Sequence, residues 1–378
     1  MTMKVLVSGV AGFIGGHVAE RYLDEGASVV GFDNLSRRGN VENIRWLSEH
    51  AESKPGRFEF VHCDIRNETD CLGLFEAHKD ADVVIHLAGQ VAVTTSFLNP
   101  RMDFEANALG TLNLLEATRL YTPKAAFVFA STNKVYGGME QVEVVLDEST
   151  GRYRYADYPK GIPETAPLDF HSPYGCSKGT ADQYVRDYAR MYDLNTVVFR
   201  QSCIYGTRQF GVEDQGWIAW FTIARLLGKP ITVYGDGRQV RDTLWVDDLV
   251  DLYQAAIGNM AVARGKVYNA GGGVGNTLSL LELVDHLKEH TGSDDPVAFD
   301  DWRPGDQRCF IADVTKAQTE LGWTPKTPPS EGVQKLADWA VRNQAVLERV
   351  LGSVGKGKDP QKQAVEQKRL QEANRGDG

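Results

Sequence analysis

Short apolar runs alternate with amphipathic stretches through the first half of the chain, and this alternation restricts the fold more than any other feature. Buried strands are predicted at 3–9, 28–34, 58–65, 81–89, 125–132 and 194–202. Helices are predicted between them, at 13–25, 67–78, 104–121 and 176–192. Apolar strands joined by helical crossovers are typical of a parallel sheet with helices on both faces. We therefore predict an α/β fold with a doubly wound parallel sheet.

A glycine triplet lies between the first predicted strand and the first predicted helix. Gly9, Gly12 and Gly15 form the pattern GxxGxxG, with Phe13 and Ile14 inside it. Glycines let the backbone turn tightly and approach a pyrophosphate, while the helix N-terminus supplies N–H groups and a positive dipole end. Because both flanking elements are present, we interpret the triplet as a dinucleotide-binding loop of Rossmann type and not as an ordinary glycine turn.

The second predicted strand ends at Asp33, 18 residues after Gly15. An acid at this position would bond the ribose diol of the cofactor, which favours NAD over NADP. A turn or helix-capping role is the alternative for Asp33. Arg37 and Arg38 could accept a 2′-phosphate, so the cofactor preference stays open. Further cofactor contacts are predicted at Asn34, Ser36, Asp64, Ile65, Leu87, Ala88, Gln90 and Asn107.

The alternation of strands and helices ends near residue 203. We predict an NAD-binding Rossmann domain over 1–202 and a smaller α+β substrate-binding lobe over 203–351 that is interleaved with it. The polar insertion 137–173 is interpreted as a flap over the substrate, or else as a surface excursion. The polar tail 352–378 is predicted to be disordered or a frayed helix, and we assign it no role.

Composition excludes several classes of function. The net charge of −10 argues against nucleic acid as a partner, and no apolar run is long enough to span a membrane. The five cysteines are scattered without a CxxC pair, so we expect reduced thiols, no metal site and a cytoplasmic protein. The apolar start of the chain is interpreted as a buried strand and not as a signal peptide.

Tyr174 and Lys178 stand four residues apart in a predicted helix and therefore share one face. A nearby cation lowers the pKa of a phenol, so we expect Tyr174 to act as a general base near neutral pH. Thr132 ends a strand at the ligand edge of the sheet and could bind the substrate oxygen. Asn107 is a poor helix former and either holds a water beside Lys178 or has a core-amide role. The pattern predicts a hydroxyl that is deprotonated while its hydride leaves for a nicotinamide.

Several segments between residues 3 and 345 resemble the extended short-chain dehydrogenase/reductase superfamily. They are GVAGFIG, VIHLAGQ, NALGTLNLLEA, STNKVYG, SPYGCSK and DTLWVDDL. The resemblance implies a triad of Thr132, Tyr174 and Lys178, in which Tyr174 is the base and acid. Lys178 would lower the pKa of Tyr174 and bind the nicotinamide ribose. It also implies a homodimer or homotetramer, with the helices at 104–121 and 176–192 as packing faces.

Longer segments are similar to one branch of this superfamily, the epimerases that act on CDP-paratose and CDP-tyvelose. They are FDNLSRRG, HLAGQVAVTTS, STNKVYGG, DFHSPYGCSKG, RQFGVEDQGWIAWF and RPGDQRCFIAD. This resemblance implies inversion at C2 through a transient 2-keto sugar, with the hydride held on bound NADH. A UDP-sugar 4-epimerase is the alternative, and a non-catalytic NAD sensor of the same fold is a third reading. Asn133 and Lys134 stand where the related 4,6-dehydratases carry an Asp-Glu pair, so elimination of water is not expected.

A nucleotide-sugar diphosphate requires cations in the substrate cleft. Arg241 and Arg303 match positions that grip the diphosphate in the relatives, and Arg208 is a further candidate, although each could be a structural arginine. Trp217 is either a substrate contact or a core residue of an apolar helix. The remaining predicted substrate contacts are Thr94, Asn133, Lys134, Gln209 and Gln215.

Overall fold

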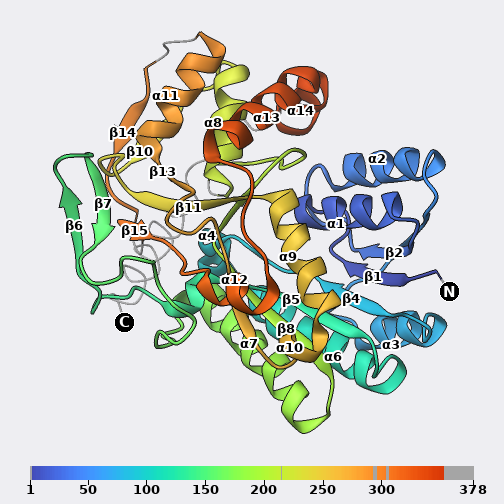
Figure 1. Ribbon diagram of the computed structural model, residues 1–378. Helices are drawn as coiled ribbons and strands as arrows, with labels where there is room; N and C mark the ends of the chain where they lie inside the picture. The colour runs from blue at the N-terminus through green and yellow to red at the C-terminus, as the bar shows by residue number, and fades with distance from the viewer. Residues whose placement is uncertain (1, 214, 293–295, 304–305, 353–378) are drawn as a thin grey trace, which may run out of the picture.

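The central element is a seven-stranded parallel sheet, seen in a computed structural model that describes residues 2–213, 215–292, 296–303 and 306–352 (Figure 1). The strand order is β12-β8-β5-β4-β1-β2-β3. The bounds are β1 Lys4–Ser8, β2 Ser28–Asp33, β3 Arg57–His62, β4 Val83–His86, β5 Ala126–Thr132, β8 Asn195–Gln201 and β12 Val267–Ala270. The predicted doubly wound α/β fold is thereby confirmed. Most of the predicted tail lies outside the described residues.

Two apolar layers cover the sheet because successive strand residues point to opposite faces. Val5 and Val7 face one core, which includes helices α1, α2 and α9, whereas Leu6 faces a second core with helices α3, α6 and α7. The helices around the sheet are α1 Phe13–Asp24, α2 Asn40–Glu52, α3 Glu68–Ala77, α4 Val93–Leu98, α5 Pro100–Phe104, α6 Gly110–Tyr121, α7 Ser172–Met191, α9 Val246–Gly258, α10 Met260–Ala263 and α12 Thr315–Leu321.

The second half of the chain builds a smaller lobe around its own apolar core. Its strands are β9 Cys203–Tyr205, β10 Thr232–Tyr234, β11 Val240–Trp245, β13 Thr277–Ser279, β14 Ala298–Asp300 and β15 Cys309–Phe310. Its helices are α8 Trp217–Leu226, α11 Leu280–Thr291, α13 Pro329–Arg342 and α14 Gln344–Leu351. The chain is interleaved, because β12 pairs with β8 in the large sheet although β9, α8, β10 and β11 of the lobe lie between them in sequence.

The polar insertion at 137–173 contains a hairpin of β6 Val144–Asp147 and β7 Arg152–Tyr155. Figure 1 shows this hairpin at the outer end of the smaller lobe, away from α1 and α2. Tyr153 donates a hydrogen bond to Asp236 at 2.7 Å, and Arg152 donates one to Thr277 at 2.7 Å. The insertion is therefore anchored to the second lobe.

Two local features differ from the sequence predictions. The predicted helix at 104–121 is divided, because a π-helical turn η1, Glu105–Leu109, joins α5 to α6. Helix α2 was not predicted.

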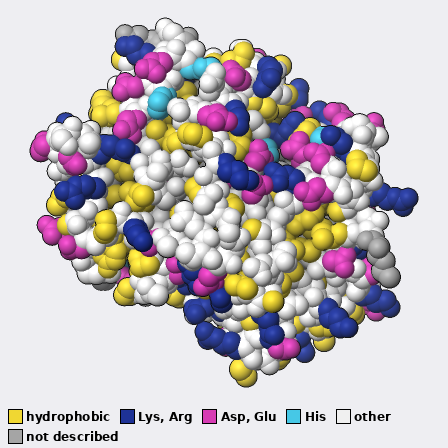
Figure 2. Space-filling model, viewed as in Figure 1, with side chains coloured by type: hydrophobic (Ala, Val, Ile, Leu, Met, Phe, Trp, Pro, Cys, Tyr) yellow, Lys and Arg dark blue, Asp and Glu magenta, His cyan; other side chains and the backbone are white. Residues whose placement is uncertain are grey.

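Figure 2 shows acidic and basic side chains interspersed over the face in view. Among the described helices, none has both the length and the apolar character that crossing a membrane requires.

Candidate active site

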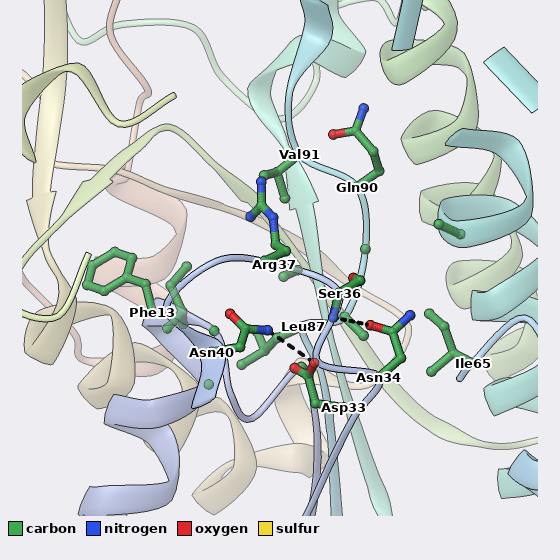
Figure 3. A pocket seen from close by; sticks show the side chains of 18 of the residues that line it. Phe13, Asp33, Asn34, Ser36, Arg37, Asn40, Ile65, Leu87, Gln90 and Val91 are labelled. Carbon is green, nitrogen blue, oxygen red and sulfur yellow. Dashed lines mark hydrogen bonds between the residues drawn. The ribbon is translucent and has the colours of Figure 1, made fainter. Parts of the chain in front are cut away.

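A cavity of about 620 Å³ lies at the carboxyl edge of the large sheet (Figure 3). It is lined by all but one of the predicted cofactor residues, namely Gly9, Gly12, Phe13, Ile14, Gly15, Asp33, Asn34, Ser36, Arg37, Asp64, Ile65, Leu87, Ala88, Gln90, Tyr174 and Lys178. Strands of a parallel sheet end at one edge, so side chains from distant segments converge there. The exception, Asn107, lies behind the cavity wall.

The glycine loop brings the backbone close to the cavity. Gly9 adopts a positive φ of 70°, and a Cβ there would lie 2.7 Å from the backbone N of Ala88. A Cβ on Gly15 would lie 2.2 Å from the Gly9 carbonyl oxygen, so helix α1 packs directly against the turn. Gly12 caps α1 without a side-chain hydrogen bond, which leaves the first N–H groups of the helix for another acceptor. This geometry fits a pyrophosphate.

Asp33 combines the two roles that were considered for it. Its carboxylate accepts hydrogen bonds from the backbone N of Leu35 at 2.7 Å and from Asn40 Nδ2 at 3.1 Å (Figure 3). Burial raises the pKa of Asp33, and these hydrogen bonds oppose the rise. The carboxylate thus shapes the loop after β2 and still lines the cavity where a ribose diol would be bound.

Asp64 lies at the same end of the cavity, on the loop after β3. Hydrogen bonds from Arg66 lower the pKa of Asp64 to about 2, so it is a carboxylate over the whole physiological range. Asn34 donates a hydrogen bond to Asp64 at 3.1 Å and therefore ties the loops after β2 and β3 together. The predicted adenosine end of the cavity is acidic and is braced by hydrogen bonds.

Tyr174 lies on α7 and Thr132 ends β5. Burial raises the pKa of Tyr174 to about 12, and the neighbouring Thr132 side chain opposes this rise. Arg37 lowers the pKa of Tyr174 and Asp103 raises it. The predicted lowering of this pKa to near neutrality is therefore wrong for the structure as it stands. The sequence shows which residues are neighbours in a helix, but it does not show how far the phenol is removed from water.

Lys178 follows Tyr174 by one turn of α7, and its side chain is also buried. Its ammonium donates a hydrogen bond to the Ala130 carbonyl at 2.5 Å and lies 4.4 Å from the ring centroid of Phe129. Burial lowers the pKa of Lys178 to about 8, and Asp103 and Asp182 oppose the shift. The pKa of the Lys178 ammonium is therefore within about one unit of neutral pH.

Asn107 lies in the π-helical turn η1, where its amide is fully used by protein groups. Its Oδ1 accepts from the backbone N of Gln90 at 2.9 Å, and its Nδ2 donates to Ser177 Oγ at 3.0 Å and to Asp103 Oδ1 at 3.4 Å. These contacts agree with the core-amide alternative. Asn107 connects the loop after β4 to helix α7, and so it supports the cavity from behind.

A second group of charges lies beyond Thr132, toward the smaller lobe. Arg241 on β11 donates a hydrogen bond to Asp306 at 2.6 Å. Burial and the charge of Arg241 lower the pKa of Lys134 to about 8, whereas Asp306 raises it. Lys134 and Arg241, both predicted substrate contacts, are therefore brought together. Arg303 lies nearby in the same lobe, with its guanidinium 3.9 Å from the ring centroid of Tyr234.

Other predicted substrate residues have protein partners or lie elsewhere. Arg208 stacks over Trp46 of α2 at 3.5 Å, and burial lowers its pKa to about 10. Trp217 donates to Cys203 Sγ at 2.9 Å and is partly buried against the core of the smaller lobe. Gln209 donates a hydrogen bond to the Ile204 carbonyl at 3.4 Å. Asn133 accepts a hydrogen bond from the Thr132 hydroxyl at 3.3 Å. Thr94 is buried in α4. Gln215 lines the cofactor cavity.

Sequence reasoning missed several polar residues at the site, among them Gln201 and Asp103. Gln201 ends β8, lines the cavity and donates a hydrogen bond to Tyr253. The rule that carboxyl ends of parallel strands face the ligand could have found it. Asp103 is fully buried one turn before Asn107 and accepts a hydrogen bond from Ser177. An acid within a helix gives no sequence signal of burial, so Asp103 could be found only from the structure.

Comparisons with known proteins agree with this architecture. The family model described as GDP-mannose 4,6 dehydratase matches residues 6–336. CDP-paratose 2-epimerase from Salmonella typhi is 48% identical over 342 residues, which are 89% of this chain and 99% of that protein. The crystal structure of UDP-glucose 4-epimerase with UDP-glucose from Thermotoga maritima is 33% identical, with a TM-score of 0.77 over 90% of this chain and 100% of that one. UDP-glucuronic acid 4-epimerase from Bacillus cereus, solved with UDP-glucuronic acid and NAD, is 29% identical, with a TM-score of 0.74 over 90% and 99% of the two chains.

Proposed function

The chain belongs to the family described as GDP-mannose 4,6 dehydratase, within the extended short-chain dehydrogenase/reductase superfamily, and we propose that it is an NAD-dependent nucleotide-sugar epimerase. In finer detail, we propose that it inverts C2 of a CDP-sugar of the paratose or tyvelose type. One observation carries the proposal. Tyr174 and Lys178 line a dinucleotide cavity, Thr132 lies beside Tyr174, and Asn133 and Lys134 follow Thr132 directly.

The cavity has the groups that NAD requires. The open N-terminus of α1 would hold the pyrophosphate, Asp33 the adenosine ribose and Lys178 the nicotinamide ribose. When bound, NAD supplies a hydride acceptor that later returns the hydride, and its oxidised ring supplies a positive charge that lowers the pKa of a neighbouring phenol. Arg37 lines the same cavity and already lowers the pKa of Tyr174.

Tyr174 moves the proton in this proposal. As a phenolate it takes the proton of the sugar hydroxyl while the C–H bond on the same carbon breaks, and Thr132 holds the oxygen. The resulting keto sugar turns to present its other face, and Tyr174 returns the proton to the oxygen when the carbon is reduced. Because both the proton and the hydride go back, the net change is inversion at one carbon.

Asn133 and Lys134 support epimerisation over dehydration, although the family model is described by a dehydratase. Loss of water needs an acid and a base beside the carbons that form the double bond. The positions after Thr132 offer an amide and an ammonium, and the ammonium lies beside Arg241. A cation pair of this kind suits a diphosphate or a sugar hydroxyl better than it suits elimination.

A second candidate, a UDP-sugar 4-epimerase, is favoured by the likeness to the Thermotoga maritima enzyme. The two proposals differ in the carbon that is inverted. The purified protein is incubated with CDP-paratose and with UDP-glucose, and the products are followed by proton NMR. With the incubation in D₂O, inversion at C2 of the CDP-sugar without incorporation of solvent deuterium at C2 supports the first proposal. Inversion at C4 of the UDP-sugar supports the second.

Two variants test whether Tyr174 carries the reaction. Tyr174→Phe removes the phenol from the cavity, and Tyr184→Phe removes a phenol that is 47% exposed on the same helix. General acid–base groups contribute roughly 10²- to 10⁴-fold to a rate. We expect a loss of that order in kcat for Tyr174→Phe and an unchanged kcat for Tyr184→Phe. Equal activity of the two variants would remove the basis of the proposal.

We also propose that helices α4 to α7 pack against a second copy of the chain. Large apolar side chains are exposed on this group of contacting helices. They include Phe97, Phe104, Leu120 and Met191, each more than two-fifths exposed. Exposed apolar surface that gathers on neighbouring helices is typical of an interface between subunits.

A further inference from the structure

Asp103 is a fully buried carboxylate that no part of the proposed reaction uses. It lies on α5, immediately before the π-helical turn η1, and its side chain has no exposed surface. Its hydrogen-bond donors in the described part of the chain are all neutral. They are Gln90 Nε2 at 2.9 Å, Asn107 Nδ2 at 3.4 Å and the hydroxyl of Ser177. A buried negative charge with only neutral donors requires a compensating cation nearby.

Burial raises the pKa of Asp103, whereas its three hydrogen bonds and the positive charge of Lys178 oppose this rise and favour the carboxylate. The reverse also holds, because Asp103 is the strongest of the two carboxylates that stabilise the Lys178 ammonium. The second carboxylate, Asp182, forms a buried ion pair with Arg200 at 3.0 Å, so its charge is already compensated. Lys178 itself donates to a neutral carbonyl. Asp103 and Lys178 are therefore matched charges on two different elements.

The contact with Ser177 attaches Asp103 to helix α7 at a position between the two residues of the proposed proton-transfer pair. Ser177 lies between Tyr174 and Lys178 on α7, and its hydroxyl bonds both Asp103 and the Tyr174 carbonyl. Gln90, from the loop after β4, binds the other carboxylate oxygen and also lines the cavity. Asp103 thus connects α5, α7 and the cavity loop through one buried group.

We propose that Asp103 is a positioning residue for the Tyr174–Lys178 pair. Through its bonds to Gln90, Asn107 and Ser177 it holds α7 against α5 and the cavity loop, and it places a buried carboxylate next to the pair. This inference rests on the proposed function in one respect, the role of the Tyr174–Lys178 pair in turnover. The effect of the Asp103 charge on the two side chains does not depend on which reaction the protein catalyses. The charged and titratable groups that face the pair are Asp103, Asp182, His86 and Arg37. His86 is buried on β4, and burial and Lys178 lower its pKa, so it is neutral near pH 7.

The sign of the effect is the same for both members of the pair. An anion near a lysine raises the pKa of the lysine, and an anion near a phenol raises the pKa of the phenol. Replacing Asp103 by Asn keeps the size of the side chain and removes the charge. Both pKa values should then fall, so Tyr174 ionises at lower pH and Lys178 loses its proton at lower pH.

The experiment uses an ultraviolet titration of the purified protein and a pH profile of turnover. Tyr174 is followed at the phenolate absorbance, as the difference between each protein and its Tyr174→Phe counterpart. We expect the Tyr174 midpoint in Asp103→Asn to move down by about one pH unit, which is a tenfold change in the ionisation constant. We also compare kcat/KM at pH 9 with kcat/KM at pH 7 for each protein. This ratio should be about tenfold lower in Asp103→Asn than in wild type.

Ser177→Ala is the matched control, because it breaks the hydrogen bond between α5 and α7 but keeps the carboxylate. It should leave the Tyr174 midpoint within a few tenths of a unit of wild type. Should Asp103→Asn fail to fold, Asp103→Ser, which is also neutral and leaves room for water, is measured in the same way. An unchanged Tyr174 midpoint in the neutral variant would overturn the proposal. The titration needs no substrate, so it is independent of whether the chain is an epimerase.

Discussion

Arg37 donates a hydrogen bond to Gln215 at 2.5 Å, and this contact joins the two halves of the molecule. Arg37 belongs to the loop after β2, whereas Gln215 precedes α8 in the smaller lobe. Both line the cofactor cavity, and Figure 3 shows Arg37 extending into it toward Val91. An epimerase that returns its hydride to the same sugar has no need to release its cofactor. A contact across the cavity suits such retention.

The first prediction concerns this contact. Arg37→Met should weaken NAD binding by roughly 10- to 150-fold, because a hydrogen bond to a charged group is worth about 1.5–3 kcal/mol. Arg38→Met is the matched control, since Arg38 is exposed in the same loop. The dissociation constant of NAD is measured by quenching of tryptophan fluorescence. Equal constants for the two variants would show that the contact does not hold the cofactor.

The second prediction concerns the glycine loop. Gly9→Ala should abolish measurable NAD binding and lower the free energy of unfolding by about 1–3 kcal/mol, because a strained positive φ and a close backbone contact coincide there. Gly73→Ala, at an exposed position of helix α3, adds a Cβ where nothing lies within 4 Å. That control should be neutral or stabilise by up to about 1 kcal/mol. Urea unfolding and NAD titration measure both effects.

The third prediction concerns Lys134, whose pKa is lowered to about 8 mainly by burial. Because the ammonium form exists below that pH, the KM for the nucleotide sugar should rise as the pH passes from 7 to 9. Lys134→Arg keeps its charge throughout this range and should flatten the rise. Steady-state kinetics at several pH values provide the measurement. A parallel rise in KM for both proteins would assign the titration to another group.

The fourth prediction concerns Asp242, which is buried on β11 and bonded by Ser202. Burial raises the pKa of Asp242 to about 7, far above its ordinary value. The folded state therefore favours the protonated carboxyl. This contribution to stability is full at low pH and is lost as the pH rises toward 7, by about 1.4 kcal/mol per unit.

Asp242→Asn removes that pH dependence while keeping the shape of the side chain. The free energy of unfolding of Asp242→Asn minus that of wild type should therefore rise from pH 5 to pH 8. The rise is expected also where the variant is less stable than wild type at pH 5. Urea unfolding at the two pH values measures the difference. A constant difference between the two proteins would contradict the raised pKa.

The fifth prediction concerns the proposed subunit interface. Phe104→Asp places a charge on the exposed apolar face of α4 to α7 and should yield monomers in light scattering at micromolar concentration. Val341→Asp, on α13, changes a side chain of nearly equal exposure elsewhere. It should leave the assembly intact. A wild-type protein that is already monomeric would refute the proposed interface.

Much of the cofactor site was predictable, because strand ends and a glycine loop are local patterns. Asp33 ends β2, Gly9 and Asp64 follow β1 and β3, and parallel strands place such positions at one edge. The ionisation of Tyr174 was not predictable, because desolvation depends on every element packed around it. Asp103 was missed for a related reason, since only contacts with α7 distinguish a buried helical acid from a solvated one.

The pairing of β12 with β8 has a consequence for biosynthesis. The cofactor sheet cannot be completed until the ribosome has made residue 270, long after β8 has emerged. During that interval β8 presents an unpaired edge, which is a template for association with other chains. A fragment that ends at residue 202 would keep that edge permanently. Nascent chains of this protein are therefore most vulnerable to aggregation while the segment between β8 and β12 is being synthesised.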